Sequence, residues 1–408
     1  MAEKRIINPD NYSWDPKYSE KAYSLAVERN GLLCVSNLTA EEYDAQRGGY
    51  IIKRLSTLEQ TKVIFEKLGA ILESAGYSYQ DVVYTVDYAL EASMPEYRHT
   101  ADVRRQAFGG SMPAAVGVLV EGLPKSAALI SMNAVAMRGG REKRAVFPEG
   151  TPTWERYKTR TFWPGFFVGE EWFWLSGATG RVYDEASKTE RYPEGIKDQA
   201  QAVWRHALGQ VMKDAGVEPS KVVRVADYVH PAGAPEYSRT HTLRRQALKN
   251  DAVAAGALPI QRLLRGEALL EIDATAYLGR DRRVVRVAGW KDAPSGADAV
   301  RCGKYVFCSA QVPMDRTTGQ VVGGGFKKQA ERAYENLQMV LGSAGVSAED
   351  VVRTVEWTDP ANAYQQDLLN EMRRRYLGPS LPAVTVVTAN QGLPTGASFS
   401  IEAWAVRA

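Results

Sequence analysis

The sequence predicts an α/β sandwich (α+β) fold that is repeated three times in tandem along the chain. Three ordered landmarks recur: an apolar strand that ends in serine, an Ala-Gly pair after an amphipathic helix, and a strand that begins with Val-Val. The serines are Ser36, Ser176 and Ser309, and the Val-Val strands begin at Val82, Val222 and Val351. The first two copies are offset by 140 residues and the last two by about 130, which is the size of a small domain. We therefore expect three domains, at residues 1–147, 166–288 and 300–408.

Each copy has the pattern strand, strand, helix, strand, helix, then one or two strands. Apolar residues recur at helical spacing before each Ala-Gly pair, as in Ile64, Leu68 and Leu72 of the first copy, and such a stripe covers one face of a sheet. The glycine is a helix C-terminal signal. The strand that follows reads VVYTVDY, VVRVADY or VVRTVEW, with the β-branched and aromatic content of a pleated surface. Alternation of helices and strands, with the helices on one face of the sheet, predicts layered α/β packing.

Composition excludes several function classes. The 408 residues are 45% hydrophobic and 24% charged, with a formal net charge of +3, which gives no support for a nucleic-acid or membrane surface. The N-terminal sequence MAEKRIINPDNY lacks the apolar core of a signal peptide. Three cysteines and four histidines show no metal-ligand spacing. We expect a cytoplasmic protein without a metal or cofactor.

The third copy resembles the RidA/YjgF/YER057c family, also described as endoribonuclease L-PSP-like. The segments that carry the resemblance are YVFCSAQVPMDRTTGQVV, QAERAYENLQMVLGSAGVSAEDVVRTVEW, NEMRRRYLGPSLPAV and GLPTGASFSIEAWAV. The first two copies are more diverged but keep the same order of landmarks. The resemblance implies three chorismate-mutase-like (YjgF-like) domains. Because family members are typically homotrimers with ligand clefts between subunits, it also implies a pseudo-trimer in one chain, with the sheets inside, the helices outside and three unequal clefts.

Family members of one domain hydrolyse reactive enamines and imines to ketones and ammonia, and an arginine after a Pro-Ala pair binds the substrate carboxylate. At that position this chain has Ala115, then the run 252–255 without proline, then Val384. No copy keeps the arginine, whose planar guanidinium binds carboxylates through two hydrogen bonds. The standard hydrolysis of 2-imino acids is therefore in doubt for this chain.

The family's acid on the last strand gives the candidate catalytic residues. The second copy has Glu271 and Asp273 on one face of that strand, and the third copy has Glu402. Two close carboxylates can raise one pKa and create an acid or base near neutral pH. His241, on the second helix of the second copy, is a fourth candidate, because imidazole titrates near neutrality.

Four residues are candidates for substrate binding: Ser176 and Ser309 at the strand ends, Asn370 at the position of a family asparagine that faces the cleft, and Arg244. Arg244 belongs to a triplet with Arg104 and Arg373, and the preceding strands carry the matching acids Asp87, Asp227 and Glu356. Either each arginine pairs with its acid and ties helix to sheet, since an unpaired buried charge is costly, or one arginine has taken over carboxylate binding.

Two functions compete. The first is a hydrolase or deaminase that acts on a C–N bond of a small polar metabolite, such as an enamine, imine or related heterocycle, in an inter-domain cleft. The second is a non-catalytic ligand-binding or scaffold protein, as loss of the arginine from every copy would suggest. Convergence of the acids, His241 and a serine in one cleft would favour the enzyme. The expected partner is a small molecule, with neither nucleic acid nor membrane, and the domain edges would allow a homodimer of pseudo-trimers.

Overall fold

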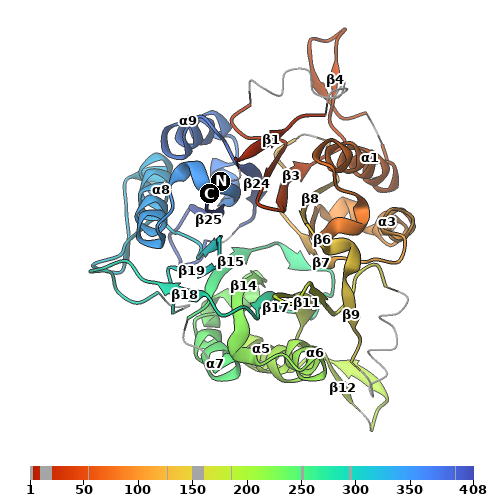
Figure 1. The fold of residues 1–408 in the computed structure, drawn as a ribbon, viewed down its shortest axis with the longest axis vertical. Coiled ribbons are helices and arrows are strands. Elements are labelled where there is room, and N and C mark those ends of the chain that lie inside the picture. Colours follow the sequence, from red (N-terminus) through yellow and green to blue (C-terminus); the bar gives the residue numbers. More distant parts are fainter. Residues whose placement is uncertain are drawn as a thin grey trace.

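The computed structural model describes residues 3–9, 21–53, 55–125, 127–148, 160–184, 186–249, 252–293, 296–390 and 392–408. Three large sheets surround a common centre (Figure 1). The first sheet contains β1 (Arg5–Ile7), β2 (Ala26–Arg29), β3 (Leu32–Leu38), β8 (Ile130–Met137), β6 (Val82–Ala89), β7 (Ala114–Leu119) and β16 (Arg262–Leu263), in that order. The second contains β15 (Ala254–Pro259), β14 (Val222–Val229), β17 (Leu270–Tyr277), β11 (Trp172–Thr179), β10 (Gly165–Val168) and β9 (Arg144–Val146). The third contains β18 (Arg282–Val285), β19 (Ala299–Cys302), β20 (Tyr305–Cys308), β25 (Phe399–Val406), β23 (Val351–Thr358) and β24 (Ala383–Thr388).

Helices cover the outer face of each sheet, so the sheets lie inside as predicted (Figure 1). The first repeat has α1 (Thr57–Ala75), α2 (Met94–Tyr97) and α3 (Thr100–Phe108). The second has α5 (Gly195–Ala202), the π-helical turn η6 (Val203–Ala207), α6 (Leu208–Ala215) and α7 (Arg239–Leu248). The third has α8 (Gly325–Ala344) and α9 (Gln366–Leu377). The fold is therefore a single-chain trimer of α/β sandwiches.

The three sheets share one register, which identifies equivalent residues without any reference to sequence similarity. In each repeat one strand pair is parallel, and Tyr84, Arg224 and Arg353 face Ala114, Ala254 and Ala383 in these pairs. On the last long strand, Asn133, Asp273 and Glu402 lie opposite Val86, Ala226 and Val355. Asp273 and Glu402 therefore occupy the same structural position, and Glu271 lies two residues earlier.

The first strand of the second and third sheets comes from the chain segment before the predicted domain. Arg144–Val146 pairs with β10 of the second sheet, although the predicted first domain extends to residue 147. Arg282–Val285 pairs with β19 of the third sheet, although the predicted second domain extends to residue 288. A short strand of the second repeat, Arg262–Leu263, also extends the first sheet by pairing with β7. Residues near the ends of the predicted first and second domains thus belong to the sheet of the following repeat.

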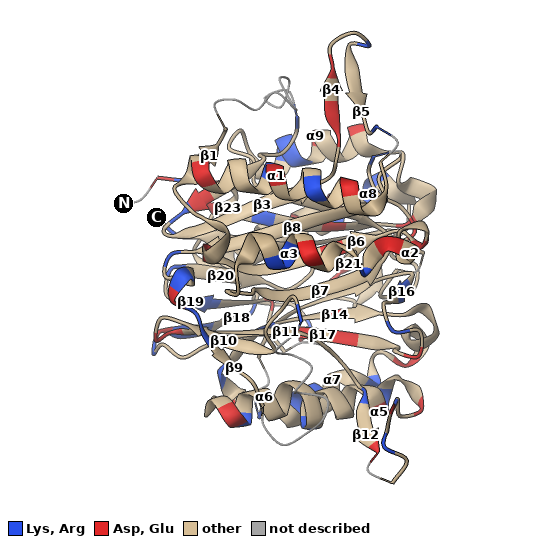
Figure 2. Cartoon of the chain, turned by 90° about the vertical axis from the view of Figure 1, so that its right-hand side faces the viewer, with Lys and Arg blue, Asp and Glu red and all other residues tan. Residues whose placement is uncertain are grey.

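A two-stranded hairpin follows the serine-tipped strand in every repeat. The pairs are β4 (Glu42–Asp44) with β5 (Gly49–Ile51), β12 (Val182–Asp184) with β13 (Thr189–Arg191), and β21 (Met314–Asp315) with β22 (Gln320–Val321). Figure 2 shows the first two projecting from opposite sides of the molecule. Lysine, arginine and acidic residues are interspersed over this side view (Figure 2). No helix in the described residues is long and apolar enough to cross a membrane.

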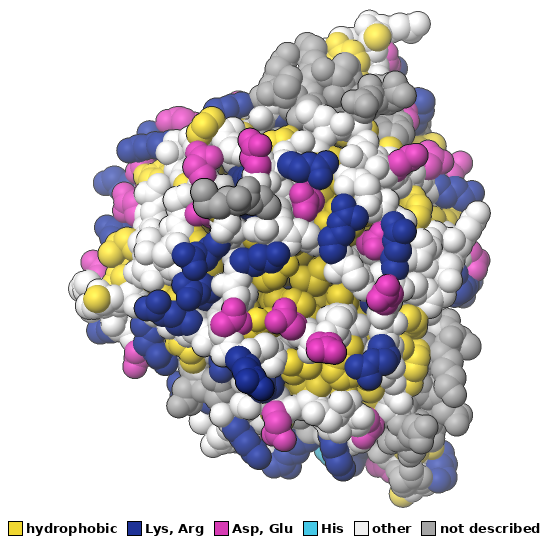
Figure 3. Space-filling view, viewed as in Figure 1, with side chains coloured by type: hydrophobic (Ala, Val, Ile, Leu, Met, Phe, Trp, Pro, Cys, Tyr) yellow, Lys and Arg dark blue, Asp and Glu magenta, His cyan; other side chains and the backbone are white. Residues whose placement is uncertain are grey.

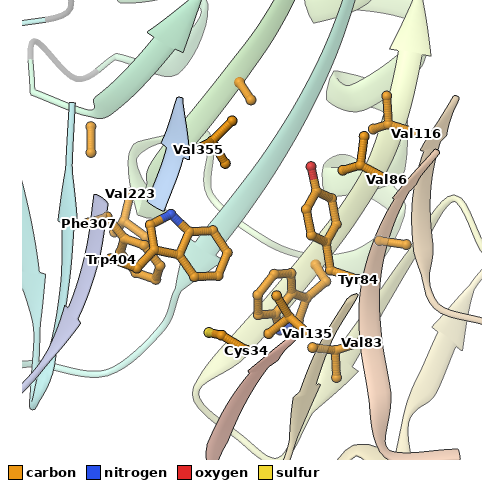
Figure 4. Close-up of a cluster of buried hydrophobic side chains, with 14 of the residues drawn as sticks. Cys34, Val83, Tyr84, Val86, Val116, Val135, Val223, Phe307, Val355 and Trp404 are labelled. Atoms are coloured by element: carbon orange, nitrogen blue, oxygen red, sulfur yellow. The ribbon is translucent and has the colours of Figure 1, made fainter. Parts of the chain in front are cut away.

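The core has two levels. Each sheet packs its outer face on its own helices, as Leu68 and Leu72 do in the first repeat and Leu337 and Leu341 in the third. The inner faces form one shared cluster, to which Tyr84, Val223 and Trp404 contribute from the three repeats (Figure 4). Seen along the axis of Figure 1, apolar side chains also gather at the centre of the face with charged side chains around them (Figure 3). The shared interior makes the repeats dependent on one another.

The serines at the strand ends fasten neighbouring repeats together. Each hydroxyl accepts a backbone N–H from a neighbouring repeat and donates to a carbonyl of the segment before its own strand. The pairs are Val384 N to Ser36 and Ser36 to Ser24 O, Ala115 N to Ser176 and Ser176 to Trp163 O, and Ala255 N to Ser309 and Ser309 to Ala297 O, at 2.6–3.0 Å. These contacts link repeat one to three, two to one and three to two, which closes the ring.

Replacement of Ser309 by alanine should destabilise the folded chain. The change leaves the N–H of Ala255 and the carbonyl of Ala297 without their hydroxyl partner, and an unsatisfied buried polar group costs about 1–3 kcal/mol. We expect Ser309→Ala to lower the free energy of unfolding by that amount in urea titrations. Ser343→Ala, at an exposed position of α8, should leave it unchanged. Equal stability of the two variants would show that the contact is dispensable.

Candidate active site

The main cavity in the described part of the chain lies between the first and second repeats. It has a volume of about 970 Å³, at the upper end of the usual range for small-molecule sites. The first repeat contributes β7 and the helices α2 and α3, including Tyr97 and Arg104. The second repeat contributes the end of β11, the β12 hairpin, the π-helical turn and Glu271. The site is thus an inter-domain cleft of the kind that the sequence predicts.

Glu271 is the cleft residue with the clearest chemical signature. It lies on β17 beside Thr179 of β11 and Tyr228 of β14. Burial, followed by the nearby Asp273 carboxylate, raises the pKa of Glu271 to about 8, against the opposing effect of Arg265. Gly177 leaves room for this carboxylate, since a Cβ atom there would lie 2.2 Å from Glu271 Oε1. A carboxyl group that is half protonated near pH 8 can donate and accept protons during a reaction.

Arginines dominate the charged lining of the cleft. Six of them, against the two acids Asp87 and Glu271, line it: Arg98, Arg104, Arg105, Arg160, Arg181 and Arg265. Arg104 is committed to Asp87 and Arg181 to Glu190. Within the described residues, Arg265 forms no ion pair with an acid. A cleft with an excess of arginine attracts anionic ligands, and the charge of Arg265 is close enough to Glu271 to oppose the rise of its pKa.

Asp273 and Glu402 lie in a different place, the polar centre of the molecule. Asp273 binds the Arg224 guanidinium and accepts a hydrogen bond of 2.8 Å from the Tyr84 hydroxyl. Glu402 lies 3.4 Å from Arg224 Nε and 3.7 Å from Arg353 Nη1, and accepts the indole N–H of Trp404 at 2.9 Å. Asp273 is fully buried. The acids here neutralise two buried arginines that come from equivalent positions of the second and third repeats.

A second cavity of about 20 Å³ adjoins this centre, between the second and third repeats. Its walls include Glu402, Arg224 and Arg353. That volume accommodates about one water molecule, so the cleft that contains Glu402 is nearly closed. These two clefts are unequal, and the open one is lined by Glu271.

The recurring arginines pair with the recurring acids in all three repeats. Arg104 contacts Asp87, Arg244 lies 2.8 Å from Asp227, and Arg373 lies 2.6 Å from Glu356. A tyrosine hydroxyl also donates to each acid, from Tyr97, Tyr237 and Tyr334. The sequence left two interpretations of these arginines open, a structural ion pair or a carboxylate ligand. The geometry is that of a buried ion pair that ties helix to sheet, and Arg244 forms such a pair.

The remaining sequence candidates do not join Glu271. His241 packs edge-on against Tyr237 with ring centroids 4.9 Å apart, and burial together with the charges of Arg244 and Arg245 lowers its pKa to about 3. Asn370 accepts a hydrogen bond of 2.8 Å from Arg373. The hydroxyls of Ser176 and Ser309 make the inter-repeat contacts described above. The predicted set therefore does not converge on one point, and Glu271 alone of it lines the large cleft.

Several cleft residues were not among the sequence candidates. Arg181 and Arg265 bring positive charge to the cleft. His206 lies within the π-helical turn and Gln210 lies just after it. A signal for the last two is present in the sequence, because the interval between equivalent landmarks of the first helix is one residue longer in the second repeat than in the other two. No group of three or more potential metal ligands occurs within the described residues.

Comparisons with known proteins agree with this architecture. A RutC family protein of Pyrococcus abyssi is 32% identical over 111 residues, which are 27% of this chain and 85% of the relative. The human 2-iminobutanoate/2-iminopropanoate deaminase is 30% identical over 130 residues, which are 31% of this chain and 90% of the relative. A chorismatase structure matches 80% of this chain and 93% of its own length, with a TM-score of 0.53 and 13% identity. The last likeness concerns the fold alone and extends over all three repeats.

The family model described as Endoribonuclease L-PSP matches residues 16–138 and 293–407, in the first and third repeats. Together these segments make up more than half of the chain, and the second repeat shares their sheet order and register. The chain belongs to the endoribonuclease L-PSP (RidA/YjgF) family, as a tandem form with three copies of the fold.

Proposed function

We propose that the cleft between the first and second repeats hydrolyses a C–N bond of a small anionic imine or enamine and releases ammonia. The observation that carries the proposal is Glu271, a carboxyl group with a pKa raised to about 8 in the open cleft. The relatives in human and mouse are named 2-iminobutanoate/2-iminopropanoate deaminases. The identity is low and covers one domain, so their substrates are a guide to the reaction class.

The reaction requires one acid–base group and one water molecule. Protonated Glu271 donates its proton to the imine nitrogen, which makes the carbon electrophilic. Water adds to that carbon, and the Glu271 carboxylate accepts the proton that water loses. Glu271, protonated again, donates to the amino group of the carbinolamine, and ammonia leaves. The hydroxyl group gives its proton back to the Glu271 carboxylate and becomes the ketone oxygen. Atoms balance as imine plus water to ketone plus ammonia, without an oxidant or a metal in the scheme.

The arginines of the cleft supply the substrate's counter-charge in place of the missing family arginine. The equivalent position is Ala115, whose methyl side chain carries no charge, and its backbone N–H already donates to Ser176. Arg265, which is close enough to lower the pKa of Glu271, is the proposed carboxylate ligand. A charge-assisted hydrogen bond contributes about 1.5–3 kcal/mol, equivalent to roughly a tenfold to hundredfold change in binding.

Ammonia release from freshly generated imines, with and without a carboxylate, tests this proposal. We expect release above the spontaneous rate for carboxylate-bearing imines, and Arg265→Gln should raise KM for them at least tenfold with a smaller change in kcat. Arg205→Gln, at an exposed position that does not line the cleft, is the matched control. No release above background from any imine would contradict the deaminase, and would leave ligand binding without catalysis as the function.

A further inference from the structure

The first helix of the second repeat contains one residue more than its counterparts between two equivalent landmarks. Gln60, Gln199 and Gln329 are equivalent, because each side chain donates to two backbone carbonyls and accepts the N–H of Leu129, Leu269 or Ser398. The helices end at the equivalent residues Ala75, Ala215 and Ala344, each followed by a glycine with positive φ. The interval between the two landmarks is 15 residues in the first and third repeats and 16 in the second.

The π-helical turn Val203–Ala207 takes up the extra residue. A single π turn inserts one residue while the helix keeps its register on both sides, and such turns are frequent at functional sites. Gly209 permits it, since a Cβ atom there would lie 1.9 Å from the carbonyl oxygen of Trp204. The insertion exposes His206 to the large cleft.

In the first and third repeats a side chain at this point ties the helix to the base of the neighbouring hairpin. The ammonium group of the buried Lys67 donates to the carbonyls of Thr39 and Glu41. The amide of the buried Asn336 donates to the equivalent carbonyls of Val312 and Met314, at 3.1 and 2.9 Å. Counting back from the helix end, the residue that matches Lys67 and Asn336 in the second repeat is Ala207.

Alanine has no donor, so the second repeat lacks this tie. The carbonyls that match those bound by Lys67 belong to Thr179 and Arg181, three and five residues after the strand-end serine. Thr179, Arg181 and Ala207 all line the large cleft, together with His206 and Gln210. The space that a lysine or asparagine side chain fills in the other two repeats is therefore part of the ligand site.

We propose that this space is a subsite for an N–H donor of the ligand, which replaces the missing side chain. The carbonyls of Thr179 and Arg181 would accept from an amide or amino group, as their counterparts accept from Asn336 and Lys67. Polar side chains His206 and Gln210 border the same wall. The assignment of this ligand as the substrate rests on the proposed function. The substrate class is then a small acid with a carboxylate at one end and an amide or amino group at the other.

Equilibrium binding of stable 2-oxo acids, the products of the proposed reaction, tests the subsite without catalysis. The probes are 2-oxosuccinamate and 2-oxoglutaramate, which carry a terminal amide, against the oxo acids of leucine and methionine, which have similar length and no N–H donor. We expect the wild-type chain to bind one of the amides about tenfold more tightly than its apolar match, given about 0.5–1.5 kcal/mol for each of two hydrogen bonds.

Two substitutions of Ala207 by side chains of similar shape, asparagine and leucine, provide the control. Ala207→Asn should restore the tie seen at Asn336, raise the stability of the chain and remove the preference for amides. Ala207→Leu should fill the same space and remove the preference without the gain in stability.

Equal affinity of the wild-type chain for the matched acids, or binding of none of them, would overturn the subsite. Persistence of the preference in both variants would overturn it as well. If ammonia release depends on Glu271 but the amide and apolar oxo acids bind equally well, only the subsite is rejected. If the amides bind more tightly but no ammonia is released, only the deaminase is rejected.

Discussion

Glu271→Gln should lower kcat for ammonia release at least a hundredfold and change KM little. Glutamine keeps the shape of the side chain but cannot transfer a proton, and general acid–base catalysis contributes typically 10²–10⁴-fold. Because the proposed ligand of the substrate's carboxylate is Arg265 and not Glu271, binding should survive. Steady-state ammonia release measures kcat and KM, and calorimetric titration with the oxo acid measures binding separately.

The pH dependence follows from the raised pKa of Glu271. The proposed first step uses the protonated acid, so kcat should fall as pH rises through about 8. The same shift destabilises the fold, because an unfolded carboxyl group ionises near 4.5 and the folded one near 8. Stability from this group is complete below pH 4.5 and decreases as pH rises from there to about 8. A wild-type rate that stays constant as pH rises through about 8, or a decline that persists in Glu271→Gln, would contradict the assignment.

Arg224→Ala should destabilise the chain by about 3–5 kcal/mol, the usual cost of removing one partner of a buried ion pair. Arg224 is buried and contacts Asp273 from its own repeat and Glu402 from the third. Its loss leaves two carboxylates at the centre with less counter-charge. The free energy of unfolding, from guanidinium or urea titration, is the measurement.

Arg375→Ala is the matched control, since Arg375 forms an exposed pair with Glu331 at 3.6 Å. Exposed pairs contribute about 0–1 kcal/mol, so this variant should unfold close to the wild type. Equal unfolding of the two variants would show that the central cluster is not a major source of stability. A large loss for Arg224→Ala alone supports three repeats joined through one charged centre.

Much of the fold can be predicted from the sequence, because hydrophobic periodicity and turn residues act locally. The Val-Val strands, the amphipathic helices and the Ala-Gly ends all occur where the landmarks place them. The pairing of Arg244 with Asp227 also follows from physics, since an arginine on an apolar helix face requires an acid. The sequence does not predict that Arg144–Val146 pairs in the sheet of the second repeat, because strand partners are set by tertiary contacts.

The candidate site is less predictable because depth along a strand decides a residue's role. Glu271 and Asp273 share one face of β17, yet Glu271 lines the open cleft and Asp273 binds Arg224 in the interior. The two look equivalent in a sequence. The position of His206 in the cleft depends on a one-residue insertion in the helix. That insertion is visible only when the intervals between landmarks are compared among the three repeats.

Ammonia release by Glu271→Gln and Glu402→Gln, side by side with the wild-type chain on one carboxylate-bearing imine, tests the central claim most directly. The claim is that the open cleft between the first and second repeats is the working one. It predicts that Glu271→Gln loses activity at least a hundredfold, while Glu402→Gln retains it, provided that both variants are folded by circular dichroism. Loss of activity in Glu402→Gln with full activity in Glu271→Gln would contradict the claim and place the chemistry between the second and third repeats.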